Sequence, residues 1–192
     1  MSIIQYLTTA QIQALSSEAI AALTTADMRA LTTAQVVALT TTQMGVLSSK
    51  QVGALTSAQI AAIETADIAA LSTSAVAGLG ASQVPSLTTA QVAALTTGQI
   101  GALSSQAIAA LETADVAALT TSAVGGFTDL QAPSFSTGQI AAFTTDQIPA
   151  LSSKFIGAMA CEASSSAGLA PMTIATSQSL PDRSFISWNA SV

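Results

Sequence analysis

Four eight-residue units, LTTAQVAA, LTTGQIGA, LSSQAIAA and LETADVAA, follow one another without a break from Leu87 to Ala118. The same frame extends in both directions, so that nineteen octads run from Leu7 to Ala158. Position 1 is Leu, Ile or Phe, and position 6 is Ile, Val or Met in every octad except the one that holds Ala132. Position 2 is Ser or Thr in sixteen octads, and position 5 is Gln in eleven. A strict period without insertions is typical of a solenoid, in which each unit stacks on its neighbours.

A period of eight fits neither a continuous helix nor a straight strand. At about 100° per residue, eight residues turn by about 800°, so position 1 would drift by about 80° in each octad and no apolar stripe would persist. Positions 1 and 6 have opposite parity, so a straight strand would direct them to opposite faces. The chain must therefore bend within each octad.

Positions 2 and 5 predict where this bend lies. Thr88 and Gln91 have the spacing of a capping box, in which the first residue caps a helix and the second returns a hydrogen bond to it. Position 2 is then the N-cap, positions 3 to 8 form a short helix, and position 6 and the next position 1 share its inner face. The sequence thus predicts an all-α solenoid of very short capped helices, one per octad. A β-solenoid with octads as its sides is the alternative.

Proline and glycine modify this pattern in particular octads. Proline at position 7 predicts a brief or kinked helix, because it removes a backbone N–H, and it occurs as Pro85, Pro133 and Pro149. Glycine near a unit end predicts left-handed helix termination or close backbone contact, and it occurs as Gly45, Gly53, Gly78 and Gly126.

The chain divides into three segments and carries a second, longer repeat. Residues 1–6 form a lead-in, residues 7–158 the octad solenoid, and residues 159–192, which hold no octads, a flexible tail or cap. The stretch LSTSAVAGLGASQVPSL (71–87) recurs 48 residues later as LTTSAVGGFTDLQAPSF (119–135). This offset equals six octads and matches whole coils if a coil holds two or three octads. Aromatic residues are 4% of the chain, which predicts a core of small and medium side chains without an aromatic centre.

Composition excludes several classes of function. The net charge is −6, with 4 basic residues against 10 acidic ones, which disfavours binding to nucleic acid. The chain has no stretch of eighteen apolar residues, so no membrane span is predicted. The N-terminal residues include no basic leader, so no signal peptide is indicated. A cytoplasmic protein and a part of a larger secreted or surface protein both remain open. Cys161 is the one cysteine and histidine is absent, so this thiol has no histidine base, and we expect neither enzyme activity nor a cofactor.

Two acidic pairs are the metal-binding candidates, Glu64 with Asp67 and Glu112 with Asp115. A three-residue spacing on a helix can bring both carboxylates to one cation. The pairs also occupy positions 2 and 5, where acidic groups stabilise a helix N-terminus, and Ca²⁺ requires six to eight oxygen ligands. A capping role is therefore the first interpretation, and Ca²⁺ binding is the alternative.

The hydroxyl side chains at position 2 form a regular series, illustrated by Thr24, Thr32, Thr40, Thr88 and Thr96. Such an array could present an ordered surface to ice or to a glycan. The same hydroxyls are explained as helix caps, so a ligand-binding surface is the second hypothesis.

The phrase LTTAQVAAL resembles the long tandem octapeptide arrays of LTTxQ(I/V)xA type found within large bacterial proteins, often described as uncharacterised or surface-associated. The resemblance covers Leu7 to about Ala158. It implies an array or stalk rather than a catalyst, and it transfers no functional residue. The sequence therefore predicts a non-enzymatic structural or spacer array, with protein contacts or self-association through its open ends as further roles.

Overall fold

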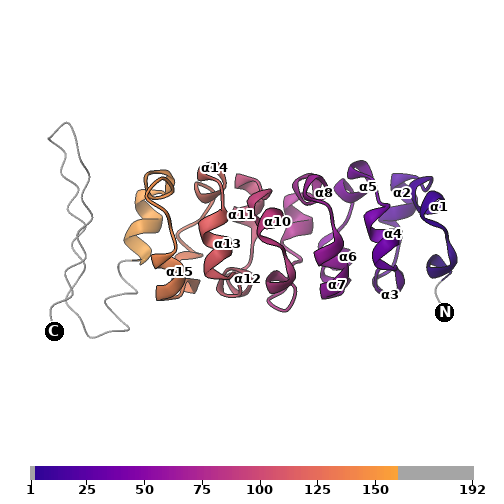
Figure 1. Ribbon diagram of the computed structural model, residues 1–192, viewed down its shortest axis with the longest axis horizontal. Coiled ribbons are helices and arrows are strands. Elements are labelled where there is room, and N and C mark those ends of the chain that lie inside the picture. The colour runs from indigo at the N-terminus through magenta and orange to yellow at the C-terminus, as the bar shows by residue number, and fades with distance from the viewer. Residues whose placement is uncertain (1–2, 160–192) are drawn as a thin grey trace, which may run out of the picture.

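Each octad folds into one short helix followed by a corner. The computed structural model describes residues 3–159, and these form an elongated rod of stacked helices (Figure 1). The α-helices are α1 (Thr9–Gln13), α2 (Ser17–Ala21), α3 (Thr25–Ala30), α4 (Thr33–Val37), α5 (Thr41–Gly45), α6 (Ser49–Ala54), α7 (Ser57–Ala62), α8 (Thr65–Ala70), α9 (Thr73–Val76), α10 (Thr89–Ala93), α11 (Thr97–Ala102), α12 (Ser105–Ala109), α13 (Thr113–Ala118), α14 (Thr121–Val124) and α15 (Thr137–Ala141). A further helix covers residues 153–159. No strand occurs in residues 3–159, so the all-α solenoid is confirmed there and the β-solenoid is excluded.

The predicted capping box forms the start of most helices. At α10 the backbone N–H of Gln91 donates to Thr88 Oγ1 at 3.2 Å, and the N–H of Thr88 donates to Gln91 Oε1 at 2.7 Å. These bonds satisfy two of the N–H groups that a helix start leaves without a partner. Position 2 is thus the N-cap, and helix length is set by the eight-residue period.

The octads with proline at position 7 form 3₁₀ helices in place of α-helices. These are η2 (Val84–Ser86), η3 (Ala132–Ser134) and η4 (Ile148–Ala150), and an additional one, η1 (Ile4–Tyr6), lies in the lead-in. The tighter turn tolerates the missing proline N–H. It also keeps position 6 inside, since Val84 has no exposed surface. The expected brief helix is confirmed in all three octads.

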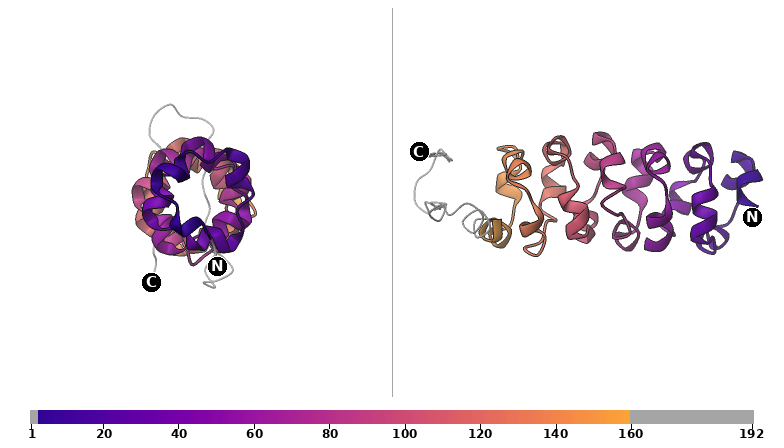
Figure 2. Two further views of the ribbon diagram at one scale, coloured as in Figure 1. Left: turned by 90° about the vertical axis from the view of Figure 1, so that its right-hand side faces the viewer. Right: turned by 90° about the horizontal axis from the view of Figure 1, so that it is seen from below.

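Successive coils contact each other through octads that are three units apart in the chain. Helix α5 packs on α8, α8 on α10, and α10 on α13. Side-chain hydrogen bonds between coils join residues 25 to 31 apart, which lies between three and four octads. A coil therefore holds slightly more than three octads. Viewed along the rod, the helices form a ring around one axis (Figure 2).

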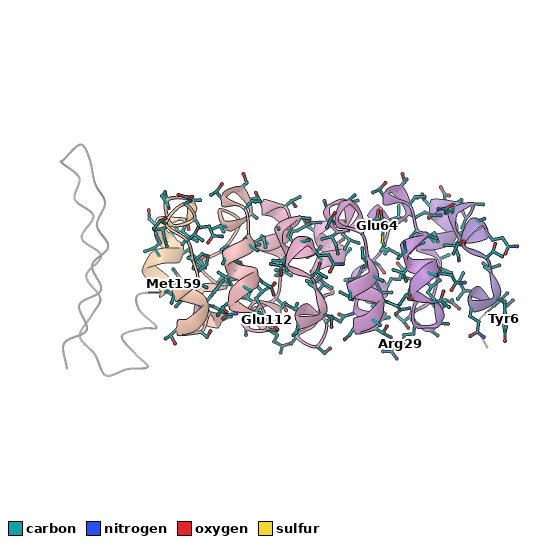
Figure 3. The ribbon with its side chains drawn as sticks, viewed as in Figure 1. Tyr6, Arg29, Glu64, Glu112 and Met159 are labelled. Atoms are coloured by element: carbon teal, nitrogen blue, oxygen red, sulfur yellow. The ribbon has the colours of Figure 1, made fainter. Side chains whose placement is uncertain are left out.

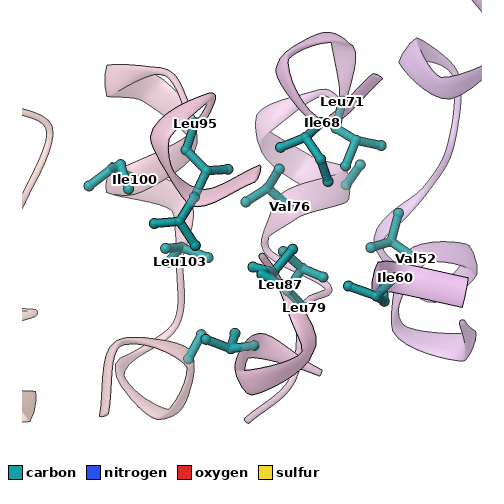
Figure 4. Close-up of a cluster of buried hydrophobic side chains, with 14 of the residues drawn as sticks. Val52, Ile60, Ile68, Leu71, Val76, Leu79, Leu87, Leu95, Ile100 and Leu103 are labelled. Carbon is teal, nitrogen blue, oxygen red and sulfur yellow. The ribbon is translucent and has the colours of Figure 1, made fainter. Parts of the chain in front are cut away.

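The core fills the centre of this ring. Position 6 side chains such as Ile60 and Ile100 are fully buried, and position 1 side chains such as Leu71 and Leu103 are 4% exposed. Figure 4 shows these side chains converging from different coils. One continuous apolar cluster runs from Ile4 to Phe155. Burial of this face supplies the stability that isolated helices of this length lack.

The expectation of a core without an aromatic centre is wrong for the last coil. Phe127, Phe135, Phe143 and Phe155 form one cluster, with ring centroids 5.0 to 6.4 Å apart. Three of them occupy position 1 of neighbouring octads, and Phe155 takes position 5 of the next coil, where the ring is fully buried. A few aromatic residues are enough to form this cluster, because the winding of the chain brings them together near one end of the rod.

Glycine at position 8 is required by close packing between coils. A Cβ added to Gly78 would lie 2.1 Å from the carbonyl oxygen of Ser49, and one added to Gly126 would lie 2.1 Å from that of Thr97. Both contacts are far shorter than van der Waals distance. Left-handed helix termination and close backbone contact were the two roles expected for glycine here, and the structure shows close backbone contact.

Candidate functional site

The glutamine at position 5 connects each coil to the preceding one. Gln59 Nε2 donates to the carbonyl oxygens of Met28 at 2.9 Å and of Leu31 at 2.6 Å. Its Oε1 accepts the N–H of Thr56, its own N-cap, at 2.7 Å. One amide thus caps the start of its own helix and binds the end of a helix in the coil beneath.

Ten glutamines repeat this arrangement, and we call them the inter-coil glutamines. Each donates to the residues 31 and 28 positions earlier, over 2.8 to 3.0 Å and 2.6 to 3.0 Å respectively. All are 1 to 5% exposed. They are Gln35, Gln43, Gln51, Gln59, Gln83, Gln91, Gln99, Gln131, Gln139 and Gln147.

Sequence reasoning found one half of this role and missed the other. The Ser/Thr-x-x-Gln spacing predicts the bond to the N-cap, but it does not predict which groups accept hydrogen bonds from the amide nitrogen. A signal existed, because helices α2, α9, α12 and α14 are capped by Ser or Thr with Ala at position 5. Glutamine is therefore more frequent than capping requires. The excess reflects contact between coils.

The acidic octads, 63–70 and 111–118, place an aspartate where other octads have the inter-coil glutamine. The structure keeps each predicted pair together at the start of one helix, Glu64 and Asp67 on α8, Glu112 and Asp115 on α13. The two pairs lie at separate levels along the rod (Figure 3). Within each pair, the aspartate is 4% exposed and the glutamate lies at the surface.

The two buried aspartates have different hydrogen-bond partners. Asp115 Oδ2 accepts the N–H of Glu112 at 3.2 Å, which is the bond that glutamine Oε1 makes in other octads. No hydrogen bond to the carboxylate of Asp67 forms among the residues that the structure describes, and since none of their fully buried side-chain oxygens lacks a partner, this carboxylate keeps contact with solvent. In both pairs the glutamate is the N-cap and the aspartate lies in the first turn, as expected, and the side-chain bond to the N–H of the N-cap forms at Asp115.

Both aspartates have a raised pKa. Burial, which disfavours the charged form, is the largest cause for Asp67, and the nearby charge of Glu64 adds to it. For Asp115 burial again dominates, the hydrogen bond from Glu112 N–H opposes it, and the charge of Glu112 reinforces it. The folded state therefore disfavours the charged form of both aspartates.

The hydroxyl series is used in helix capping. Thr24, Thr32, Thr40, Thr88 and Thr96 are N-caps, and each Oγ1 accepts an N–H from position 5 at 3.2 to 3.4 Å. These oxygens therefore stabilise the helix starts, while their residues remain exposed. Cys161 and the segment 160–192 lie outside the described residues.

Two classes of site have no representative in the part of the chain that the structure describes. Residues 3–159 contain no group of three or more His, Cys, Asp or Glu side chains placed to hold a metal ion. None of the helices within residues 3–159 has the length and apolarity that a membrane crossing requires.

Comparison with known proteins identifies the repeat. The model of the ALTTAQ repeat family matches residues 20–57, 60–97, 93–129 and 108–145, which together span more than half of the chain. No curated protein and no solved structure shows a significant match. The tandem matches confirm that the octads form a repeat array. The chain therefore belongs to the ALTTAQ repeat family.

Proposed function

We propose that this chain is a non-enzymatic structural array that holds its two ends at a fixed separation. The observation that carries the proposal is the unbroken set of contacts between coils. Inter-coil glutamines bind carbonyl oxygens from Ile4 to Leu119, and the apolar core continues to Phe155. Because successive coils pack on one another along the described rod, and the inter-coil glutamines add bonds at ten octads, the rod resists bending and its length follows the number of octads.

The use of polar side chains supports the non-enzymatic part of the proposal. Hydroxyls at position 2 cap helices, and the amides at position 5 bind backbone groups on two sides. Catalysis needs a nucleophile or base that is free to change its bonding. The chain has no histidine, and its regular polar groups have structural partners.

The setting proposed for the array follows from its resemblance to bacterial octapeptide arrays. We infer that it acts within a larger bacterial surface-associated protein, as a spacer and a platform for protein contacts. Its ends are proposed to self-associate, since the first-coil residues Leu7, Leu15 and Leu23 are only partly buried by the described residues.

Deletion of one long repeat tests the spacer function. Removing residues 79–126 deletes six octads and joins LSTSAVAG to FTDLQAPS, a junction closely similar to the existing one at 126–127. We expect small-angle X-ray scattering to show a rod shortened in proportion to the octads removed, with unchanged helicity per residue. Deleting residues 79–122 instead shifts the frame by four residues and should unfold the segment beyond the junction. An in-frame deletion that unfolds the chain would refute the proposal.

Light scattering tests the proposed self-association. The average mass of the full chain should rise with concentration as ends meet. If the mass stays at that of one chain at high concentration, this part of the proposal is refuted. The spacer function is tested separately, by the deletion experiment.

A further inference from the structure

We propose that a second copy of this chain stacks the start of its rod on the last described coil of the first copy. The N-terminal surface of this contact consists of Leu7, Leu15 and Leu23, at position 1 of the first three octads. The C-terminal surface consists of Ile140, Ile148 and Ile156, at position 6 of the last three octads. The inference rests on the self-association included in the proposed function, and it specifies which surfaces meet.

Exposure at position 6 shows what a following coil covers. From Ile12 to Ala132, every side chain at this position is 0 or 1% exposed. The three isoleucines of the C-terminal surface are only partly buried. Because a coil holds slightly more than three octads, these isoleucines belong to the last coil that the structure describes. Inside the rod, position 6 is therefore covered by the coil that follows.

Exposure at position 1 changes at the opposite end of the rod. From Leu31 to Leu151, every side chain at this position is 2 to 9% exposed. The three leucines of the N-terminal surface, in the first coil, are only partly buried by the described residues. Position 1 is therefore covered by the coil that precedes it. Each junction inside the rod joins position 6 of one coil to position 1 of the next.

The N-terminal and C-terminal surfaces are thus the two halves of the junction that the rod repeats within itself. They lie at opposite ends of the rod, where α1 and α15 are found (Figure 1). When the N-terminal surface of one copy meets the C-terminal surface of another, position 1 packs against position 6, as it does between inner coils. Contact between two like surfaces would not reproduce this pairing. Continuity with the repeated junction therefore favours a second copy as the partner, since interfaces of permanent homodimers resemble a core cut in half.

A polar group in the first coil agrees with this pairing. Gln11 occupies position 5 of the first octad, the position of the inter-coil glutamines, and its side chain is exposed. In later octads the amide nitrogen donates to carbonyl oxygens of the preceding coil, as Gln35 Nε2 does to Leu7 at 2.7 Å. A copy stacked before the first coil would offer Gln11 acceptors of the same kind.

The charges of the end coils do not oppose the contact. Residues 3–30 hold two acidic side chains, Glu18 and Asp27, and one basic side chain, Arg29. Residues 135–159 hold one of each sign, Asp146 and Lys154. Both described ends therefore have a low net charge, and burial of apolar surface determines the association.

Two variants of the full chain, each blocked at one end, test which surfaces meet. Leu15→Glu places a charge in the N-terminal surface, and Ile148→Glu places one in the C-terminal surface. By light scattering, each variant alone should associate about tenfold more weakly than the unmodified chain, or weaker still. An equimolar mixture should restore association and stop at the mass of two chains, because one unblocked surface of each kind remains.

Matched variants separate docking from other effects. Leu130→Glu is the control, because Leu130 is 82% exposed and belongs to neither surface, so this variant should associate as the unmodified chain does. Leu15→Thr and Ile148→Thr remove apolar surface without adding charge, and they replace a glutamate variant that loses helicity. Each should weaken association alone while hydrogen exchange in α4 to α8 is unchanged, since repeat units couple mainly to neighbours.

Three results would overturn the inference. Undiminished association of Leu15→Glu or Ile148→Glu alone would show that like surfaces meet. Weakened association of Leu130→Glu would assign the contact to the side of the rod. In both cases the self-association would stand and only the pairing of surfaces would fail.

The third result is an unmodified chain that keeps the mass of one chain at high concentration. It would refute the self-association together with this inference, and the spacer function would still be tested by the deletion experiment. Greater loss of thermal stability in Ile148→Glu than in Leu15→Glu would then identify residues 160–192 of the same chain as the cover of the C-terminal surface.

Discussion

Gln59 Nε2 lies 2.6 Å from the carbonyl oxygen of Leu31, a residue 28 positions earlier in the chain. This hydrogen bond is repeated with little change along the rod, and it unites two coils that contribute to one apolar core. It gives each of the ten octads that carry an inter-coil glutamine a specific partner outside its own helix. Stability between coils therefore depends on one side-chain type as well as on burial.

Replacement of an inter-coil glutamine should destabilise the array more than loss of a cap alone. Gln91→Ala removes the cap bond and leaves the carbonyl oxygens of Ile60 and Ile63 without their donor. We expect a loss of about 2–3 kcal/mol in the free energy of unfolding, measured by urea denaturation. Gln11→Ala is the control, because Gln11 is exposed and bonds to Thr8 alone, and it should cost less than about 1 kcal/mol. Equal losses would contradict a role between coils.

Substitution of the closely packed glycine should be severely destabilising. Gly78→Ala places a methyl group against the backbone of Ser49, which cannot move without displacing α6. We expect a loss of about 2–4 kcal/mol, above the usual range for a single substitution. In Gly157→Ala the added Cβ meets no atom within 4 Å, and higher helix propensity should stabilise that helix slightly. Circular dichroism during thermal unfolding distinguishes the two, and similar melting temperatures would contradict the close contact.

The two buried aspartates should stabilise the protein as the pH falls below neutrality. Their pKa values are raised in the folded state, so Asp67 and Asp115 bind protons on folding as pH falls through that folded pKa. The free energy of unfolding should increase as pH falls toward the unfolded value of about 3.9, and decrease as pH rises.

The variant Asp67→Asn, Asp115→Asn isolates this effect from other carboxyl groups. Glu18, for example, has a lowered pKa, mainly because of a backbone hydrogen bond, and contributes in the opposite direction. The difference in stability between the variant and the unmodified chain should shrink in acid. A difference that is constant with pH would contradict the raised pKa values.

The phenylalanine cluster should determine the order of the last coil. Phe155 is fully buried, stacks on Phe127 with a centroid distance of 5.5 Å, and meets Phe135 edge to face at 5.4 Å. Phe155→Ala should therefore cost about 3–5 kcal/mol locally. Hydrogen exchange should accelerate in α15 and the adjacent 3₁₀ helices while α4 to α8 keep their protection, since repeat units couple mainly to neighbours. Uniform acceleration along the rod would contradict a local role.

The local features of this fold could be predicted from the sequence because their partners are close in the chain. Thr88 and Gln91 are three residues apart, and Pro85 affects the turn in which it lies, so caps and 3₁₀ helices follow from spacing and covalent geometry. The contacts between coils could not be predicted in this way. The partner of Gln91 Nε2 depends on the number of octads in a coil, and a periodic sequence allows more than one such number.

The acidic pairs show the same difference between local features, which the sequence predicts, and contacts between coils, which it does not. The spacing of Glu112 and Asp115 predicted that they lie together at a helix start, which the structure confirms. The burial of both aspartates against another coil does not follow from that spacing, because it depends on the register between coils. The convergence of Phe127 and Phe155 was missed for the same reason, because 28 residues separate two rings that stack.

The inter-coil glutamines also make the rod directional. Every amide nitrogen points toward the N-terminal end, so Gln11 in the first coil has an Nε2 with no acceptor among the described residues. At the other end, the carbonyl oxygens of Phe143 and Leu151 receive no such amide from the described residues. The first coil thus holds one amide donor of this kind, on Gln11, and the last described octads hold backbone acceptors. The self-association that we propose is therefore head to tail, which gives an open filament in place of a twofold dimer.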